Sequence, residues 1–558
     1  APERFALALY HFNLQFVSGN REAEDRVVSE SFLPLVEMYL AHPGWGADFE
    51  LQGGMVEAMA ERHPEALEKF RRLLAAGRAE AVSFHHWDQL LLAFPRHDAR
   101  VSIRLAREAF ERAGLPLSKV VFAQEAQVGE GIHRLAEEEG YEVVLWTGGN
   151  FRFFRPDGEI APWCADGRAR IVVGESVRHP RVEVKWTKFG DGEPVATGST
   201  PYALYGIARR PFRFDPRRLA EYEARLAGLE AAGWRIASAS EYTRFLGDAG
   251  IEPEPFPDVL ETARQENTQN VFLWMGKQVH PLEDDHEVLS RAYRARTEVL
   301  AAEVAVEWLA RTAEVSDERV LVRRAWSKAL SAQVSDATGW TPLPIEVRTS
   351  LADSDAAMAL AREATRIVKE RLGCRWLAID TGSGEARPLD ERPAEDEGRP
   401  VDSGPAEVTI DGPVLGEEVR WTAHGGGRTD VAIEFLTPAG LLAPVEVSFE
   451  RARGPFAYAP ALVEDRLHEV DLDAQPFDHI WLALPSGLVR LRPGLYLVKH
   501  CPVGHIAARA GKADSKVAFA LDRPTVKRYR FRFSLYEGEE KGAIELARRI
   551  NTHPTLVR

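Results

Sequence analysis

Polar and ionisable side chains gather at the ends of four apolar runs in the first 150 residues. In a fold of parallel β/α units, reactive side chains come from the C-terminal ends of the strands, so these positions are candidates for chemistry. The residue types found there could transfer protons, attack a reacting carbon or contact a sugar ring. They are His11, Asn13 and Gln15; His85, His86, Trp87 and Asp88; Gln124 and Glu125; and Trp146 and Asn150.

Glu125 is the candidate catalytic residue. It ends the run "VVFAQE" (120–125), so an otherwise apolar strand delivers a carboxylate to the rim of the fold. A carboxylate in that position suits a nucleophile that attacks a sugar carbon. The alternative is an acidic residue that interacts with the dipole of the helix expected from Gly129.

The third run ends in "HHWD" (85–88), which is open to two interpretations. Asp88 has the same ambiguity as Glu125, and Trp87 offers either an apolar face for a sugar or a buried structural ring. A zinc site built from His11, His85 and His86 is an alternative, but adjacent residues of a strand point to opposite faces. Only one of the two adjacent histidines would then reach the site, and we expect no metal and no other cofactor.

The elements that must position these side chains alternate between strands and helices from Phe5 to about Leu246, which is typical of parallel β/α units. An amphipathic helix is expected over 99–113, ended by Gly114. No glycine-rich phosphate loop follows the first strand, so we predict an incomplete (β/α)7 barrel rather than a nucleotide-binding sheet. Strands are expected at 5–16, 47–52, 79–87, 119–125, 141–147, 202–207 and 234–238.

Two further regions follow the predicted barrel. Helical periodicity dominates 281–372, with an interruption at 339–344, and indicates a helical bundle. The stretch 384–405 is rich in Gly, Pro, Glu and Asp and is expected to be a linker, after which alternating segments predict a β-sandwich-like domain with a last helix at 539–550. The expected domains are a catalytic barrel at 1–250, a helical domain at 251–375 that completes the active site, and a β-rich domain at 376–558.

Composition narrows the classes of partner. The 558 residues carry 70 Lys and Arg against 85 Asp and Glu, a net charge of −15 that would repel phosphate backbones, so no nucleic-acid partner is expected. The longest apolar runs are far shorter than the roughly 20 residues that cross a bilayer, so no membrane partner is expected either. Three scattered cysteines fit a reducing compartment, and we expect a cytoplasmic protein, although a removed leader would leave the same sequence.

The segments at 63–98 and 117–146, which contain "HHWDQLL" and "FAQEAQ", resemble the barrel of glycoside hydrolase family 57. That family includes α-amylases, 4-α-glucanotransferases and branching enzymes on a (β/α)7 barrel followed by a helical region. The resemblance extends over about residues 5–375. It implies that Glu125 is the nucleophile and that Asp88 stands where the family usually has a Glu.

The segment "LSAQVSDATGW" (330–340) is similar to the family's Ala-Gln-x-Asn-Asp-Ala motif, whose Asp and following aromatic residue face the sugar. The resemblance therefore implies that Asp336 and Trp340 lie at the active site. The alternative for Asp336 is a helix-terminal cap before Gly339. The segment "SASEYTRFL" (238–246) is similar to the family's last-strand Ser-Glu-Tyr segment.

Two departures from the family pattern concern the site. The family's first-strand His-x-His-Gln-Pro is here "HFNLQF" (11–16), so substrate contacts differ, and the penultimate strand "YALYGIARRPF" (202–212) has no carboxylate for the general acid. Asp191 in "FGDGEP" is a weak substitute, because Asp-Gly between strand-like runs is a hairpin signal. Asp215 before Pro216 fits an N-cap.

The sequence thus predicts a carbohydrate-active enzyme, a glycoside hydrolase or glucanotransferase that acts on an α-linked oligo- or polysaccharide by a retaining mechanism. The sugar would be held by His11, Asn13, His86, Trp87, Asp88, Asp336 and Trp340. One alternative is a non-catalytic glycan-binding protein on a degenerate glycosidase barrel. Another is a metal-dependent enzyme that resembles deacetylases and mannosidases.

Overall fold

The computed structural model shows a mixed α/β protein with parallel and antiparallel sheets. Its contacts divide the chain into unit 1, Ala1–Asp88 and Arg100–Thr268, and unit 2, Gln89–Ala99 and Gln269–Arg558. The division into three domains stays a prediction. The structure describes residues 2–14, 19–123, 126–154, 159–190, 193–197, 213–256, 285–334, 344–393, 397–438, 444–475, 478–501, 507–512, 514–521 and 528–558.

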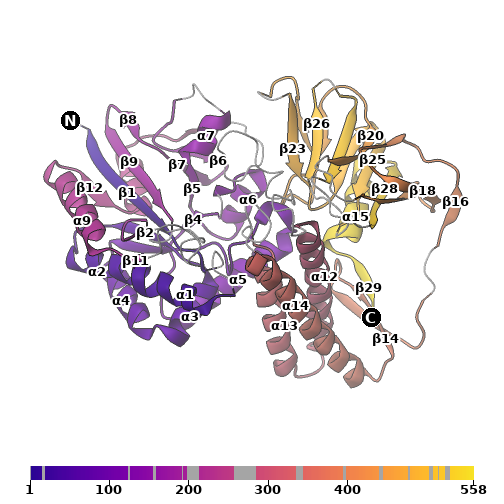
Figure 1. The fold of residues 1–558 in the computed structure, drawn as a ribbon, viewed down its shortest axis with the longest axis horizontal. Coiled ribbons are helices and arrows are strands. Elements are labelled where there is room, and N and C mark those ends of the chain that lie inside the picture. Colours follow the sequence, from indigo (N-terminus) through magenta and orange to yellow (C-terminus); the bar gives the residue numbers. More distant parts are fainter. Residues whose placement is uncertain are drawn as a thin grey trace. The chain divides into compact units, whose positions relative to one another are not determined.

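The first sheet of unit 1 is built around strand β1 (Glu3–His11), which pairs in parallel with three neighbours (Figure 1). Its register sets His11 opposite Glu50 of β2, and Glu50 opposite Val82 of β3. The C-terminal ends of β1, β2 and β3 therefore lie at one edge of the sheet. The strand order is β3 (Ala79–Val82), β2 (Ala47–Glu50), β1, β9 (Val182–Phe189) and β8 (Val177–His179), and β12 (Arg235–Ala237) also pairs with β1.

The second sheet of unit 1 carries the strand that precedes Glu125. Strands β4 (Val120–Phe122), β5 (Val143–Thr147) and β7 (Ala169–Gly174) are parallel, and β6 (Cys164–Asp166) and β13 (Glu254–Pro255) extend the sheet. A parallel bridge between Ala81 and Leu117 links it to the first sheet. The ladders thus form two sheets joined by this bridge, and a closed seven-stranded barrel remains a prediction.

Most strands expected in unit 1 are found, but residues 164–189 differ from the expectation. They form β6 to β9, where no strand was predicted, and β9 pairs with β1 over eight residue pairs. The signal was present in the alternating "VEVKW" and in the Asp166-Gly167 turn, where Gly167 has a φ of +60°. The strand expected at 202–207 lies outside the described residues.

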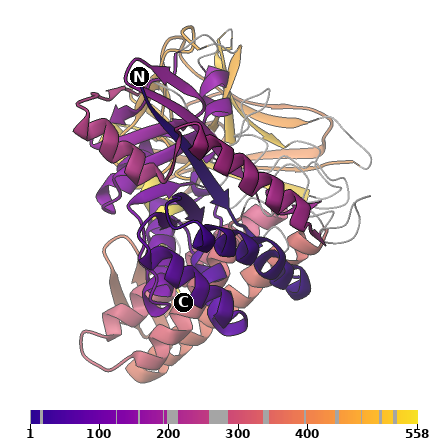
Figure 2. The same ribbon diagram turned by 90° about the vertical axis from the view of Figure 1, so that its left-hand side faces the viewer.

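Amphipathic helices cover the parallel strands of unit 1, and Figure 2 shows the indigo strand β1 running toward the indigo helices. In α4 (Pro64–Ala75), Leu67, Phe70 and Leu74 are buried at helical spacing. The ring of Phe70 packs against Phe49 of β2. The other helices are α1 (Arg21–Val27), α2 (Leu33–Ala41), α3 (Gly53–Arg62), α5 (Arg96–Arg112), α6 (Glu130–Glu138), α7 (Gly148–Phe154), α9 (Pro216–Ala231) and α10 (Ala239–Asp248), with the π-helix η2 (Val28–Phe32) and the small pair β10 (Ala196–Thr197) and β11 (Arg213–Phe214).

Three long helices form the helical part of unit 2: α12 (Asp285–Leu309), α13 (Ser316–Ser331) and α14 (Pro344–Leu372). The segment 89–99, with the 3₁₀ turn η3 (Leu91–Ala93), packs among them. Asp98 in this segment forms a fully buried ion pair with Arg296 of α12 at 2.8 Å. In the described part of the chain, no helix has the length and apolar character needed to span a membrane.

The remainder of unit 2 is β-rich, with two antiparallel sheets that meet through Phe449, Phe519 and Phe533. One sheet has the order β16 (Arg399–Val401), β18 (Leu415–Ala423), β19 (Arg428–Leu436), β28 (Arg528–Glu537), β25 (Leu495–Lys499), β24 (Leu488–Arg492), β21 (Phe456–Tyr458) and β22 (His468–Val470). The other has β17 (Val408–Asp411), β20 (Val445–Glu450), β27 (Lys516–Leu521), β26 (Ala507–Gly511) and β23 (His479–Ala483). The last helices are α15 (Glu540–Ala547) and the π-helix η5 (Arg548–Thr552).

The stretch 384–405 was expected to be a linker, but its described residues include two strands. Strand β15 (Glu385–Leu389) pairs with β14 (Trp376–Asp380), which also pairs with β29 (Thr555–Val557), and β16 pairs with β18. Both β15 and β16 are edge strands, where proline and charged residues are tolerated. Edge strands such as β15 and β16 can therefore have the amino-acid composition that is typical of a linker.

Candidate functional site

A buried polar cluster lies at the C-terminal ends of β1, β2 and β3 in unit 1. Each of its members has at most 7% of its surface exposed, although none is apolar. Buried polar groups are costly unless they are hydrogen-bonded, so such a concentration at one sheet edge needs a reason. The members are His11 and Asn13 at the end of β1, Glu50 and Gln52 at the end of β2, and His85, His86 and Asp88 after β3.

His11 and Glu50 form a buried pair. The register of β1 and β2 sets them side by side, and the Nδ1 atom of His11 is hydrogen-bonded to the Oε2 atom of Glu50. Burial raises the pKa of Glu50 well above its usual value, and the nearby charge of Lys188 opposes that effect. The pair therefore retains a proton inside the site.

Gln52 ties the ends of the three strands together. Its side-chain amide donates to the Oδ1 atom of Asn13 at 2.9 Å and to the Oδ2 atom of Asp88. Its carbonyl oxygen accepts from the backbone N–H of Leu14 at 3.3 Å. Asn13 and Asp88, two of the residues expected to bind substrate, are thus held by one amide.

Sequence reasoning missed Glu50 and Gln52. A usable signal was present, because the second strand, "ADFE" (47–50), ends in a carboxylate and is followed by "LQ".

In the "HHWD" segment, His85 and His86 are fully buried, whereas Trp87 is partly exposed. Burial lowers the pKa of His85 to about 3, and the proximity of His11 adds to the effect, so His85 is neutral near pH 7. The backbone N–H of His86 donates to Ser102 at 2.8 Å. Trp87 is half-buried and packs closely against the start of α3, where a Cβ atom on Gly54 would stand 2.2 Å from its ring.

The end of β4 lies beside the buried pair. The ring of Phe122, the last residue of β4, is 5.8 Å from the ring of His11, centroid to centroid. The Nζ atom of Lys188 on β9 is 5.4 Å from the same Phe122 ring. Strands β1, β2, β4 and β9 therefore bring their C-terminal ends toward one point. Gln124 and Glu125 lie outside the described residues. In the sequence they follow the buried strand β4 and Ala123.

The backbone after Glu125 has an unusual conformation. Ala126 has a φ of +50°, and only one other non-glycine residue in the described ranges, Leu462, has a positive φ. The indole N–H of Trp146, a fully buried residue at the end of β5, donates to the carbonyl oxygen of Ala126 at 3.1 Å. Such a conformation costs on the order of 1–3 kcal/mol and persists only where neighbours enforce it.

In unit 2, a second polar network precedes the "SDATGW" segment. Val334 forms an antiparallel bridge with Gln89, and the backbone N–H of Leu90 donates to the carbonyl of Gln333 at 2.9 Å. The amide of Gln333 donates to Asp98 at 2.8 Å, next to Arg296. Asp336 and Trp340 lie outside the described residues, as do Asp191 and Gln15.

Two remaining expectations concern a helix cap and metal ligands. Asp215 accepts from the backbone N–H of Arg217 at 2.9 Å, which confirms its assignment as the N-cap of α9. In the ranges that the structure describes, no group of three or more His, Cys, Asp and Glu side chains is arranged to hold a metal ion.

No protein-family model matches the chain, and no curated protein matches its sequence. Among solved structures, an α-mannosidase from Enterococcus faecalis V583 aligns with a TM-score of 0.59 and 9% identity, over 100% of this chain and 90% of the other. A protein of glycosyl hydrolase family 38 from Enterococcus faecalis aligns with a TM-score of 0.57 and 8% identity, over 100% and 89%. A 4-α-glucanotransferase from Thermococcus litoralis aligns with a TM-score of 0.43 and 13% identity, over 96% and 100%. At these identities the first two likenesses establish one point: the fold resembles that of glycoside hydrolases.

Proposed function

We propose that the protein is a carbohydrate-active enzyme, a glycoside hydrolase or transglycosylase that acts on an α-linked glycan with Glu125 as nucleophile. The observation that carries the proposal is the left-handed backbone at Ala126, held by Trp146, directly after that carboxylate. Costly backbone conformations cluster at functional sites, where they aim a reacting group. The glycosidase-like fold and the family 57 resemblance support the same assignment.

The position of β4 supports a shared site for Glu125 and the buried pair. Three peptide units separate Glu125 from Phe122, so their Cα atoms are at most about 11 Å apart. The ring of Phe122 contacts His11. We therefore propose that Glu125, His11 and Glu50 serve one active site.

In a retaining mechanism the nucleophile attacks the anomeric carbon while an acid protonates the departing oxygen. Glu125 would form the glycosyl–enzyme bond as the glycosidic bond breaks, and water or a second sugar would then displace it. The acid must stay protonated near neutral pH. Glu50, with its raised pKa and its hydrogen bond to His11, is our candidate for the source of that proton.

The other proposed contacts to the sugar are polar groups fixed by Gln52. Asn13 and Asp88 are presented from the ends of two strands, and their shared amide partner restricts their rotamers. Preorganised polar groups of this kind stabilise developing charge without reorganising during the reaction. We propose that His86 and Trp87 border the same cleft, and that Asp336 and Trp340 complete it.

The test is a comparison of the wild-type protein with Glu125→Gln on a panel of α-linked aryl glycosides and oligosaccharides. Gln nearly preserves the shape of the side chain but is far too weak a nucleophile, so turnover should fall by several orders of magnitude with an unchanged melting temperature. Glu142→Gln, an exposed carboxylate on the neighbouring strand connection, is the matched control and should keep full activity. Near-wild-type turnover by Glu125→Gln would exclude the mechanism.

The likeness to an α-mannosidase over the full chain favours one second candidate, a metal-dependent mannosidase-like enzyme. The panel therefore includes α-mannosides beside α-glucosides. Stoichiometric metal in the purified protein, with activity lost on its removal and unaffected by Glu125→Gln, would select this candidate.

A further inference from the structure

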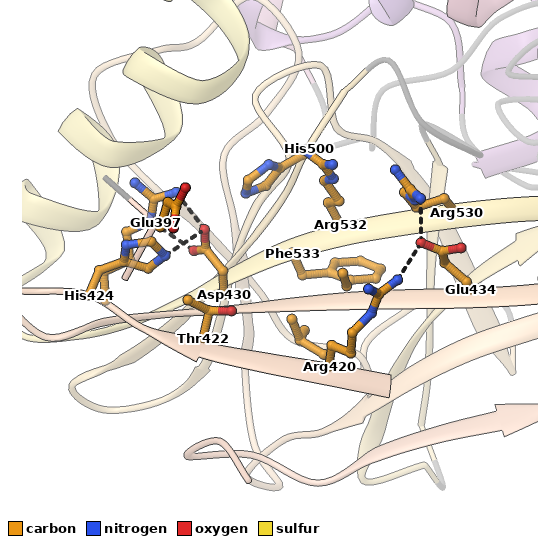
Figure 3. Close-up of a pocket in the computed structure, with 13 residues that line it drawn as sticks. Glu397, Arg420, Thr422, His424, Asp430, Glu434, His500, Arg530, Arg532 and Phe533 are labelled. Carbon is orange, nitrogen blue, oxygen red and sulfur yellow. Dashed lines mark hydrogen bonds and ion pairs between the residues drawn. The ribbon is translucent and has the colours of Figure 1, made fainter. Parts of the chain in front are cut away.

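A pocket on the β-rich part of unit 2 lies outside the proposed active site. It has a volume of about 430 Å³ and lies on the face formed by β18, β19 and β28 (Figure 3). This volume is within the range of small-molecule sites. Its lining is polar, with four arginines, two histidines and three carboxyl groups: Arg420, Arg428, Arg530, Arg532, His424, His500, Glu397, Asp430 and Glu434.

The strand register explains how the pocket arises. Ala432 of β19 is opposite Arg420 of β18 on one side and opposite Arg532 of β28 on the other. The backbone N–H of His500 donates to the carbonyl of Arg532 at 2.8 Å, which extends the row by one strand. The methyl group of Ala432 thus forms the floor of the pocket between Arg420 and Arg532, whose strands are about 10 Å apart.

Two ion-pair groups border this row. At one end, Asp430 is bound by Arg428 at 2.6 Å and by Ser534 at 2.6 Å, and His424 is 3.3 Å away. At the other end, Glu434 is 93% buried on its side chain and is bound by Arg420 at 2.8 Å and Arg530 at 2.5 Å. Figure 3 shows Arg532 and His500 between these two groups.

Arg532 differs from the other three arginines. Among the described residues it forms no ion pair, although it is exposed and borders the pocket. Of the described lining residues, four are arginines and three carry carboxyl groups, an excess of one positive charge. Among the described lining residues, Phe533 is the only Phe, Tyr or Trp, and it is fully buried, so none of these three ring types is exposed there for stacking on a neutral sugar.

We propose that this pocket binds a compact oxyanion, the carboxylate, phosphate or sulfate group of a small acidic molecule such as an acidic sugar. The anion would lie over Ala432, with the guanidinium of Arg532 as its main partner and Arg420 as a flanking donor. Planar guanidinium groups bind such anions with two parallel hydrogen bonds. This site depends on the β-rich part alone and is independent of the proposed glycosidase activity.

The test measures binding to the full-length protein by isothermal titration calorimetry, with glucuronate, glucose 6-phosphate, inorganic phosphate and neutral glucose as probes. We expect binding of at least one anionic probe, with glucose at least tenfold weaker. If phosphate and glucose 6-phosphate bind alike, the oxyanion itself is recognised; preference for a sugar-linked anion identifies an acidic sugar as the ligand. The proposal would be overturned if glucose bound as tightly as the anions, or if no anion bound at concentrations up to about 10 mM.

Three variants locate the site. Arg532→Ala should weaken anion binding about tenfold or more, because it removes a charge-assisted contact. Ala432→Leu should block the pocket by filling its floor while every charge is retained. Arg453→Ala is the matched control, since Arg453 is an exposed arginine of the β-rich part that does not line the pocket, and it should bind as the wild type does. Unchanged binding by a folded Arg532→Ala protein would overturn the assignment, even if Ala432→Leu failed to fold.

Discussion

At the scale of single residues, the polar groups at the ends of β1 to β3 are restrained by one another. Gln52 spans Asn13 and Asp88, and Glu50 shares a hydrogen bond with His11. Because a buried donor or acceptor left without its partner costs about 1–3 kcal/mol, these residues constrain each other's replacement. The pair with the clearest chemical consequence is His11–Glu50, because burial raises the pKa of the Glu50 carboxyl and so favours its protonated form.

Glu50→Gln tests the proton source. An acid whose pKa is raised stays protonated to higher pH, and its contribution is lost as pH rises through that pKa. The wild-type kcat/KM should therefore show an alkaline limb above the usual range of a carboxyl group, and Glu50→Gln should lack this limb. The variant should lose at least about 100-fold in turnover of glycosides with poor leaving groups.

Leaving-group dependence supplies the control for this experiment. A glycoside with a strongly acidic phenol as leaving group needs little protonation, so Glu50→Gln should hydrolyse it at near-wild-type rates. Glu125→Gln should fail on both kinds of substrate, because it removes the nucleophile. Equal losses on activated and unactivated glycosides would remove Glu50 from the role of proton source.

Trp146→Phe tests whether the backbone after Glu125 is held for function. The substitution keeps most of the buried ring but removes the indole N–H that binds the carbonyl of Ala126. We expect a loss of about 1–2 kcal/mol in the free energy of unfolding and a larger relative loss in kcat than in KM. Chemical denaturation and steady-state kinetics measure both, and an unchanged kcat would mean that the Ala126 conformation is structural only.

At the scale of elements, the sequence predicted what local patterns determine and missed what tertiary pairing determines. The N-cap at Asp215 and the helix 99–113, found as α5, follow from local capping and periodicity. The strands between 164 and 189 were missed because parallel pairing of β9 with β1 depends on contacts some 180 residues apart in the chain. The same long-range pairing turns residues 399–401, which have a linker-like composition, into β16.

The buried ion pair between Asp98 and Arg296 fixes the segment 89–99 among the helices of unit 2. Arg296 also donates to the carbonyl of Thr552 at 3.1 Å, and Asp98 accepts from Gln333, so the pair connects several elements. Asp98→Ala would leave the guanidinium buried without its counter-ion, which costs about 3–5 kcal/mol. Urea denaturation should report this loss for unit 2.

A surface pair gives the comparison for Asp98→Ala. Arg319 and Glu307 are both more than half exposed and lie 2.8 Å apart, so Arg319→Ala should change the free energy of unfolding by about 0–1 kcal/mol. Similar losses for the two variants would mean that the Asp98–Arg296 pair does not anchor the segment.

At the scale of the whole molecule, the chain passes from one unit to the other next to the buried polar cluster. The first of the two segments of unit 1 ends with Asp88 of the buried polar cluster, and the next residue, Gln89, belongs to unit 2 and pairs with Val334. Val334 is two residues before Asp336. Two peptide units limit the Cα separation of Val334 and Asp336 to about 7.6 Å.

This connectivity motivates the prediction that Asp336 serves the same site as Glu125. Asp336→Ala should raise KM or lower kcat by at least tenfold, because it removes a carboxylate that accepts hydrogen bonds from sugar hydroxyls, with little change in melting temperature. If Asp336 only caps a helix, Asp336→Ala should lower the melting temperature and leave the activity unchanged. Asp336→Ser, which can still cap a helix, should then have the stability of the wild type. A crystal structure with bound substrate that separates Asp336 from Glu125 by more than about 15 Å would contradict a shared site, since groups that bind one sugar lie within a few ångströms of it.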